Sequence, residues 1–185
     1  MVLTIPSVKT ERLILREFQP ADVDCLHLIY QHEGVLQYFP NPDPPSKESI
    51  SRWVDSQQAH WAEHACGNWA IVQQADSQVI GWAGLQFLPE LDEVETGFLL
   101  DRPFWGKGYA TEAAQASIRF GFELGLTQIV ALVHPQNLGS QRVLEKSGMQ
   151  YDRSLQLWGL DLMHYRIYKS LPVSQHSETD RQAQL

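Results

Sequence analysis

The most specific chemical signal in the chain is the segment RPFWGKGYATEAAQASIRFGFELG, residues 102–125, in which two glycines flank one lysine directly before an alanine-rich stretch. A tight turn would need only one glycine. Because glycine has no Cβ, Gly106 and Gly108 together let the backbone approach a bulky ligand closely. The N–H groups of residues 106–111 fall at the start of the expected helix, where they have no partner inside it. Free donors and a helix dipole that point the same way are typical of a phosphate site.

The turn Gly106–Gly108, called the glycine turn below, does not match two common nucleotide-binding loops. A Walker A loop, GxxxxGK[ST], is absent, and the dinucleotide fingerprint GxGxxG would need glycine or alanine where the chain has Thr111. A glycine pair before a helix also occurs in ordinary tight turns. Small residues behind the turn, among them Ala110 and Ala113, favour close packing of the helix on a sheet. The pattern alone therefore predicts a pyrophosphate cradle, with a plain turn as the alternative.

The overall composition limits the partners of such a site. Among 185 residues there are 14 Lys and Arg against 22 Asp and Glu, a net charge of −8, whereas nucleic-acid surfaces are usually basic. Cys25 and Cys66 form neither a CxxC pair nor a disulfide framework. The N-terminal residues lack the apolar core of a signal peptide, and no run reaches the roughly 18 apolar residues of a membrane span. We expect a cytoplasmic protein without a nucleic-acid or membrane partner.

Strands and helices alternate along the chain. Apolar runs and alternation predict strands over residues 12–18, 68–73, 79–88, 94–100, 128–133 and 162–168. Amphipathic spacing and capping residues predict helices over 20–32, 46–64, 109–124 and 140–148. Because there are no internal repeats or linkers, residues 1–171 are expected to form one α/β domain. The remaining residues, 172–185, are polar and aperiodic and are expected to be a disordered tail.

Three separated segments carry a family resemblance. VETGFLL followed by FWGKGYATEA, the downstream HPQNLGSQRVLEKSGM and the opening TERLILREFQPADVDCL resemble the GNAT family of acyl-CoA-dependent N-acyltransferases, in particular its ribosomal-protein N-acetyltransferase (RimJ/RimL) branch. The resemblance covers residues 8–170. It departs from the broad family pattern at Pro103, where that pattern has Gln or Arg, and Arg102 is one place off. A side-chain contact to phosphate from this position is therefore not implied.

The resemblance implies a fold and a co-substrate. The fold is a single GNAT-type α/β domain, whose mixed, mostly antiparallel twisted sheet has about seven strands and about four flanking helices. The co-substrate is acetyl-CoA, with its pyrophosphate on the amides of residues 106–111 and its pantetheine arm between strands 94–100 and 128–133. No metal is expected. The residues implied to bind acetyl-CoA are Phe98, Leu99, Leu100, Gly106, Lys107, Gly108, Tyr109, Ala110, Thr111, Asn137, Ser140 and Arg142.

The implied reaction is attack of an amine on a thioester, which needs a base because a protonated amine cannot attack. A terminal amine of pKa about 8 costs about 1.4 kcal/mol to deprotonate at pH 7, against about 4.6 kcal/mol for a lysine of pKa about 10.4. A modest carboxylate base therefore suffices for a terminal amine. Glu95 matches the family's carboxylate and shares a strand face with Gly97 and Leu99. An ordinary strand-end carboxylate is the alternative, and direct or water-mediated action stays open.

Further groups are implied around the thioester. Ser140 matches the position that assists the departing thiolate in this branch. The spacing also places Asn137, Ser140 and Leu144 on one helical face, although Asn137 could be a simple helix cap. A backbone N–H of strand 94–100 is expected to hold the oxyanion, with Tyr109 as an alternative donor. Transfer would then be direct, without a covalent enzyme intermediate.

The acceptor amine is not identified by the sequence. The branch acetylates N-termini of ribosomal proteins, whereas relatives act on polyamines, antibiotics and free amino compounds. Homodimers also occur among them, and this possibility stays open. Segments 30–65 and 154–163 are expected to form the acceptor groove. Four tryptophans in or beside these segments could hold a cationic amine or belong to the core: Trp53, Trp61, Trp69 and Trp158.

Two alternatives keep other functions open. The segment HWAEH matches the H-x-x-E-H pattern of zinc hydrolases, with His60, Glu63 and His64 as its functional positions. Zinc would need a third protein ligand and an open coordination position, and no further Glu stands out. The second alternative is a catalytically silent acyl-CoA-binding sensor, because a fold does not guarantee activity. The presence of both Glu95 and Ser140 disfavours it, since a pure binder needs neither.

Overall fold

The computed structural model describes residues 4–170. Its helices are α1 (Asp22–Gln31), α2 (Lys47–His64), α3 (Tyr109–Glu123) and α4 (Leu138–Lys146), with a short 3₁₀ turn at Arg102–Phe104. Its strands are β1 (Val8–Lys9), β2 (Leu13–Arg16), β3 (Asn68–Gln73), β4 (Val79–Leu88), β5 (Glu93–Leu100), β6 (Gln128–Val133), β7 (Gln150–Leu157) and β8 (Leu160–Tyr168). The predicted tail, 172–185, lies outside the described residues. Within residues 4–170, no helix combines the length and apolar character that crossing a membrane requires.

The strands form one mixed sheet in the order β1-β2-β3-β4-β5-β6-β8-β7. Every neighbouring pair is antiparallel except β5 and β6, which are parallel. The expected α/β fold of GNAT type is thus confirmed, with eight strands where about seven were expected. Two of these strands were not predicted. The first, β1, has only two residues, and β7 buries no side chain fully, so neither shows the apolar alternation of a half-buried strand.

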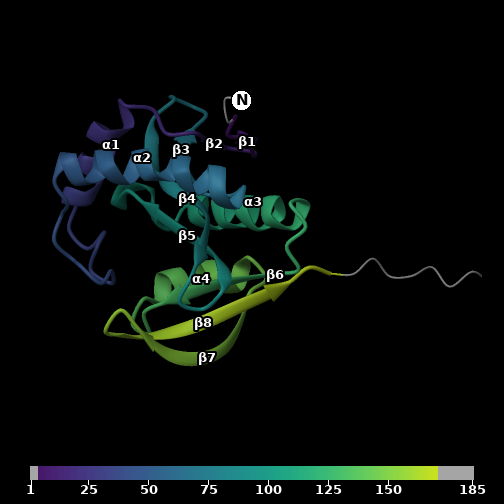
Figure 1. Ribbon diagram of the computed structural model, residues 1–185. Helices are drawn as coiled ribbons and strands as arrows, with labels where there is room; N and C mark the ends of the chain where they lie inside the picture. Colours follow the sequence, from purple (N-terminus) through teal and green to yellow (C-terminus); the bar gives the residue numbers. More distant parts are fainter. Residues whose placement is uncertain (1–3, 171–185) are drawn as a thin grey trace, which may run out of the picture.

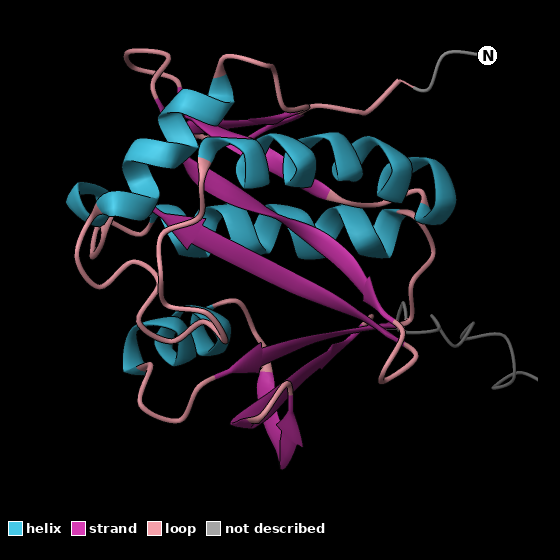
Figure 2. Cartoon of the chain, turned by 60° about the vertical axis from the view of Figure 1, so that its left-hand side comes forward, coloured by secondary structure: helices cyan, strands magenta, loops and turns pink. Residues whose placement is uncertain are grey.

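Helices cover both faces of the sheet (Figures 1 and 2). Ala70 and Val72 of β3 pack in one cluster with side chains of α1 and α2, whereas the alternate residues Trp69 and Ile71 pack with those of α3. Because β3 is buried on both faces, its sequence is continuously apolar. The predicted start of α2 is confirmed, since the Ser46 side chain caps the helix.

The core accounts for three of the four tryptophans that were expected near the acceptor groove. Trp61 and Trp69 are 2% and 0% exposed, and their ring centroids lie 4.9 Å apart. Trp53 packs edge-on against Phe18 at 5.2 Å. Of the four, Trp158 alone is exposed. The core alternative therefore holds for Trp53, Trp61 and Trp69.

The two parallel strands of the sheet are paired at one position only. Glu95 of β5 pairs with Val130 of β6, and no second pair joins these strands. Beyond this point β5 continues along β4 as far as Leu100, while β6 follows β8 as far as Val133. The strands converge at one end of the molecule and fan apart toward the other (Figure 2). The gap between them, called the β5–β6 opening below, lies where the pantetheine arm is expected.

Candidate active site

A cavity of about 180 Å³ fills the β5–β6 opening. It brings together side chains that are far apart in the sequence. From β5 come Glu95, Thr96, Gly97 and Phe98; from β6 come Ala131, Leu132 and Val133; from the start of α4 and its first turns come Asn137, Ser140 and Leu144. Both predicted catalytic residues, Glu95 and Ser140, therefore line one cavity.

Beyond Glu95, the edge of β5 that faces the opening is not paired with β6. Asp101 donates its N–H to the Ile80 carbonyl at 2.8 Å, on the β4 side. Because bonding directions alternate along an antiparallel strand, the N–H groups of Phe98 and Leu100 face away from β4 and toward the opening. The Leu100 carbonyl accepts from the indole of Trp105 at 2.8 Å. Leu99 turns its backbone to β4 and buries its side chain, so it does not face the opening.

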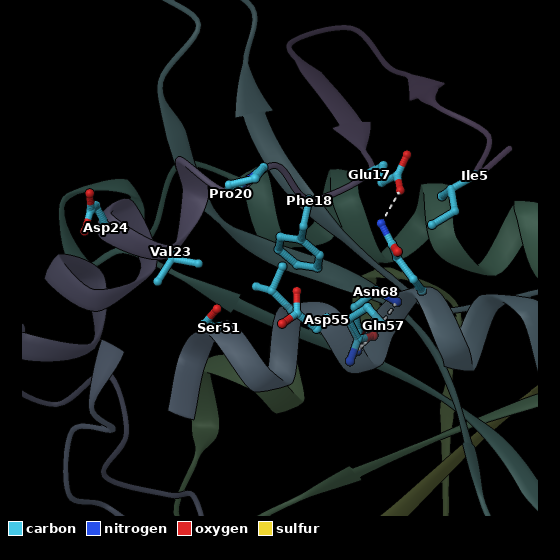
Figure 3. A pocket seen from close by; sticks show the side chains of 12 residues that line it. Ile5, Glu17, Phe18, Pro20, Val23, Asp24, Ser51, Asp55, Gln57 and Asn68 are labelled. Atoms are coloured by element: carbon cyan, nitrogen blue, oxygen red, sulfur yellow. Dashed lines mark hydrogen bonds between the residues drawn. The ribbon is translucent and has the colours of Figure 1, made fainter. Parts of the chain in front are cut away.

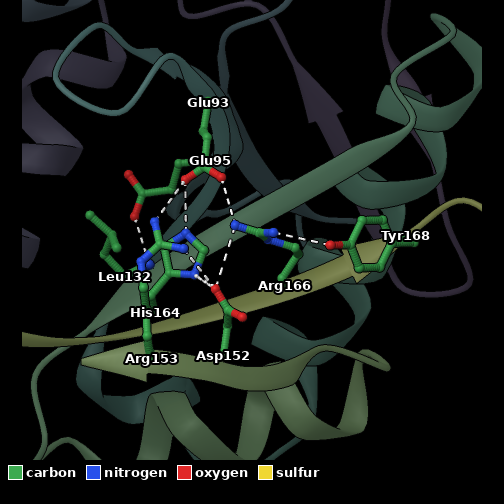
Figure 4. A network of polar contacts seen from close by, with 8 residues as sticks. All are labelled: Glu93, Glu95, Leu132, Asp152, Arg153, His164, Arg166 and Tyr168. Carbon is green, nitrogen blue, oxygen red and sulfur yellow. Dashed lines mark hydrogen bonds and ion pairs between the residues drawn. The ribbon is translucent and has the colours of Figure 1, made fainter. Parts of the chain in front are cut away.

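Glu95 lies at the point where the strands part (Figure 4). Its Oε1 accepts the N–H of Leu132 on β6 at 3.0 Å, and its half-buried side chain lines the cavity. Burial raises the pKa of the Glu95 carboxyl to about 7, while the hydrogen bond from Leu132 acts in the opposite direction. A carboxyl group of this kind can take a proton near neutral pH.

The neighbouring carboxylate, Glu93, is tied into an ion network that was not predicted (Figure 4). Its Oε2 lies 2.8 Å from Nε2 of the fully buried His164, and its Oε1 accepts from Arg166 at 2.9 Å. Asp152 lies 3.3 Å from the other nitrogen of His164. These residues are brought together by β5, β7 and β8, so no local sequence pattern reveals them. Both oxygens of Glu93 are thus engaged, and Glu93 does not line the cavity, whereas Glu95 does.

The glycine turn leads directly into α3. Gly106 and Gly108 have φ values of +73° and +83°, which favour glycine. Within the described residues, no backbone carbonyl or side chain accepts from the N–H groups of residues 106–111. The Lys107 ammonium lies 5.5 Å from the ring centre of Phe104, beside these donors. The turn therefore offers a set of unpaired donors and one cation.

Arg12 anchors the glycine turn and was not predicted as a site residue. Its Nη1 donates to the Lys107 carbonyl at 2.9 Å, and its Nε pairs with Glu112 at 2.7 Å. The same guanidinium lies 4.4 Å from the ring centre of Tyr109. The Tyr109 hydroxyl accepts from Gln73 at 3.1 Å, outside the residues that line the opening. Tyr109 is therefore placed as a packing residue of the turn rather than as an oxyanion donor.

The first turn of α4 faces the opening. Asn137 is the N-cap of this helix, with its Oδ1 accepting from the Ser140 N–H at 3.1 Å, and it also lines the cavity. Asn137 can therefore cap α4 and still line the cavity in which the co-substrate is expected. The Ser140 hydroxyl has no hydrogen-bond partner among residues 4–170. Arg142 is exposed, and lies about 200° around the helix from Ser140, outside the cavity.

The outer part of the cavity is aromatic and apolar. Tyr38 and Phe39, which follow α1, lie there with Trp82 of β4 and Trp158 of the β7–β8 turn. The ring of Tyr38 stacks on His134 at 5.2 Å, which links the segment after α1 to the end of β6. The expected acceptor segments thus meet at the opening. Trp82 was not predicted, because its run in β4 reads as an ordinary apolar strand.

The geometry does not favour the zinc alternative. His60 accepts the Phe87 N–H on its Nε2 at 3.3 Å, so the lone pair that a metal would need is engaged. Glu63 has a side chain that is 76% exposed. In the part of the chain that the structure describes, no three His, Cys, Asp or Glu side chains are arranged to hold a metal ion.

A second cavity, of about 300 Å³, lies between α1 and α2 (Figure 3). Three carboxylates line it, those of Glu17, Asp24 and Asp55. Asp24 is paired with Lys47 at 2.6 Å, and Glu17 accepts from Gln58 at 3.1 Å. The cavity is larger than the β5–β6 opening, but it contains none of the predicted site residues. We therefore place the reaction at the opening.

The unpaired helix N-terminal amides after β5 suit a ligand that carries a phosphate group. Residues 12–150 match the family model described as "Acetyltransferase (GNAT) domain", so the chain belongs to the GNAT acetyltransferase family.

Known proteins agree with this assignment. The uncharacterized N-acetyltransferase p20 of Bacillus licheniformis is 32% identical over 152 residues, covering 76% of this chain and 80% of p20. The crystal structure of an acetyltransferase from Agrobacterium tumefaciens is 29% identical with a TM-score of 0.79, covering 91% of this chain and 98% of that one. The ribosomal L7/L12 acetyltransferase RimL, solved with coenzyme A, is 19% identical with a TM-score of 0.74, covering 89% and 97%, and shares the fold.

Proposed function

We propose that this chain transfers the acetyl group of acetyl-CoA to a primary amine by direct attack, with Glu95 as the base. The observation that carries the proposal is the position of Glu95: a carboxyl group with a pKa of about 7 at the parting of β5 and β6, across one cavity from Ser140. A base with a pKa near the working pH combines the reactive ionisation state with useful basicity.

The unpaired donors of the site fit acetyl-CoA. The N–H groups of residues 106–111 would hold the pyrophosphate, with charge added by Lys107. The free backbone of Phe98 and the capping side chain of Asn137 would bind the pantetheine arm along the opening. Leu99 and Arg142, implied by the family resemblance, do not face this path, and we leave them out of the proposed site.

In the proposed reaction the amine nitrogen bonds to the thioester carbon while Glu95 takes a proton from that nitrogen, directly or through water. The carbonyl oxygen becomes an oxyanion, and the N–H of Phe98 donates to it. When the tetrahedral intermediate collapses, the carbon–sulfur bond breaks. The Ser140 hydroxyl stabilises the leaving thiolate, which takes up a proton to leave as free CoA.

The direct test is release of the CoA thiol from acetyl-CoA in the presence of an amine panel that includes peptides beginning with Ala or Ser, spermidine and aminoglycosides. We expect release with at least one class of amine. Thermal stabilisation by acetyl-CoA without release for any amine would instead support the sensor alternative.

Replacing Ser140 by Ala should lower kcat about tenfold to a hundredfold, since a hydrogen bond to a charged group is worth about 1.5–3 kcal/mol. The helix cap should survive, because Asn137 accepts the backbone N–H of Ser140 and not its hydroxyl. The measurement is kcat from thiol release at saturating acetyl-CoA. Ser147→Ala, at the other end of α4, is the matched control and should leave kcat unchanged. An unchanged kcat in Ser140→Ala would remove Ser140 from the mechanism.

A further inference from the structure

The turn between β7 and β8 contains a tryptophan in an unfavourable backbone conformation. Trp158 has φ +52°, and the next residue, Gly159, has φ +76°. Two-residue hairpin turns with both φ values positive prefer Asn-Gly or Asp-Gly. A bulky residue in the left-handed region is rare, because its Cβ crowds the backbone. Since such outliers cluster at functional sites, the position points to a use for the Trp158 side chain.

The side chain of Trp158 reaches over the β5–β6 opening. Trp158 is 47% exposed and lines the cavity, and its indole Nε1 donates to Glu90 at 3.0 Å. Glu90 belongs to the β4–β5 turn, so the hydrogen bond joins the two hairpin turns beside the opening. This hydrogen bond holds the indole ring of Trp158 at the cavity, although the turn itself lies at the surface. Local backbone preference does not explain this arrangement, but a contact with a ligand would.

The charges of the cavity restrict that ligand. Glu95 is the sole carboxylate among the described residues that line it, and no Lys or Arg lines it. Aromatic and apolar side chains from other elements also line the cavity, among them Tyr38, Phe39, Pro40, Trp82, Trp158, Leu160 and Leu162. A second ammonium group on the acceptor would lose hydration there and would find no lining carboxylate besides Glu95, because Glu90 lies outside the cavity and is bonded to Trp158. One ammonium beside an apolar group, in contrast, is matched by aromatic faces and by Glu95.

We propose that Trp158, with Tyr38 and Phe39, forms an acceptor subsite for a primary amine that carries one positive charge on an apolar or aromatic carbon skeleton. This inference rests on the proposed function and narrows it, because it disfavours polyamines and aminoglycosides. The same chemistry occurs in small arylalkylamines and in peptide N-termini with apolar first residues. Both sources are therefore arms of the test.

The test combines one variant with two amine series. In the wild type, kcat/KM for phenethylamine should exceed that for cadaverine at least about tenfold, and a tetrapeptide that begins with Phe should exceed one that begins with Lys by a similar factor. The series with the higher kcat/KM, small amines or peptides, identifies the kind of acceptor. In Trp158→Asn, kcat/KM for the preferred amine should fall about tenfold through KM, with the KM of acetyl-CoA unchanged. Trp158→Phe should retain most of the activity.

Stability separates this role from a structural one. Asn suits the left-handed turn better than Trp, so Trp158→Asn should unfold at the same or a higher temperature while binding the amine more weakly. Ser77→Asn is the control, because Ser77 has φ +60° in the β3–β4 turn and does not line the opening. It should keep the wild-type kcat/KM for every amine.

Equal use of cadaverine and phenethylamine, or an unchanged acceptor KM in Trp158→Asn, would overturn the inference. Failure of the proposed function would give a different result, namely no thiol release with any amine. If no thiol is released, calorimetric titration of phenethylamine in the presence of CoA measures binding to the subsite directly. Binding that weakens in Trp158→Asn would still support the subsite, and binding that does not weaken would reject it.

Discussion

Replacing Glu95 by Gln should lower kcat for acetyl transfer by about 10²- to 10³-fold, the usual contribution of a positioned general base. Gln has nearly the same shape as Glu, and its Oε1 can still accept from the Leu132 N–H that Glu95 binds at 3.0 Å. The KM of acetyl-CoA should change little, because Glu95 has no contact with the glycine turn. Steady-state thiol release at pH 8 with saturating acetyl-CoA measures both quantities.

The pH dependence gives this prediction a second readout. Since burial raises the pKa of Glu95 to about 7, kcat/KM in the wild type should rise as pH increases through 7, where the carboxylate forms. Ionisation of the acceptor amine adds a second rise near its own pKa. In Glu95→Gln the rise near pH 7 should disappear, and the rise due to the amine should remain.

Stability should change in the opposite sense to activity. The folded protein holds the Glu95 proton more tightly than the unfolded chain, for which the pKa is 4.5. The free energy of unfolding of the wild type therefore falls, relative to that of Glu95→Gln, as pH rises from 4.5 through about 7. Thermal unfolding at pH 5 and pH 8 tests the sign. Above pH 7 the variant should be at least as stable as the wild type.

Glu63→Gln is the matched control, because Glu63 is largely exposed and belongs to the H-x-x-E-H pattern. It should leave kcat unchanged. If Glu63→Gln lost activity while Glu95→Gln kept full activity, Glu95 would not be the base. That result would instead support the zinc alternative.

Replacing Gly106 by Ala should raise the KM of acetyl-CoA at least about tenfold, since one lost hydrogen bond to phosphate is worth about 1.5–3 kcal/mol. A Cβ at Gly106 would meet no protein atom within 4 Å, so the substitution causes no internal clash. Its φ of +73° disfavours Ala, however, and relaxation of the backbone would turn the N–H groups of residues 106–111 away from a phosphate. The kcat at saturating acetyl-CoA should remain near that of the wild type.

Gly125 provides a close control. It has φ +98°, and a Cβ there would also meet nothing within 4 Å, but it lies between α3 and β6, away from the glycine turn. Both variants should lose similar stability, and only Gly106→Ala should lose affinity for acetyl-CoA. At Gly108 a Cβ would lie 3.3 Å from Arg12 Nη2, so a larger residue there would also disturb the anchor of the turn. Equal KM values in the two variants would contradict the phosphate cradle.

The helices and strands that can be predicted from the sequence are those marked by a pattern of neighbouring residues. The Ser46 cap marks the start of α2, and β3 is recognisable because four consecutive apolar residues, Trp69–Val72, form its centre and such a short apolar run is typical of a buried strand. The glycine turn is equally local, since φ preference and the unpaired amides of a helix start depend on neighbouring residues. The strand β7 could not be predicted, because all its side chains are at least partly exposed.

The same distinction between short sequence patterns and long-range contacts applies to the residues of the proposed site. Glu95 and Ser140 could be proposed from motifs that are a few residues long. Arg12 could not, because its partner Glu112 is one hundred residues away in the chain. In the sequence, Trp82 and Trp158 cannot be told apart from the tryptophans of the core. Only the tertiary structure shows that these two line the opening.

The sequence by itself determined the order of the four helices and of six of the eight strands, the glycine turn and the family resemblance, and it put Glu95 forward as the base. Each of these depends on residue types over short spans, through backbone propensity, periodicity or unpaired helix ends. Only the tertiary structure decided which tryptophans are core, which of Glu93 and Glu95 has an unpaired charge, and where a cavity exists. These properties arise from strand order and from the pairing of β5 with β6 at one position, Glu95 with Val130. Burial, and with it the raised pKa of Glu95, exists only once those distant segments have come together.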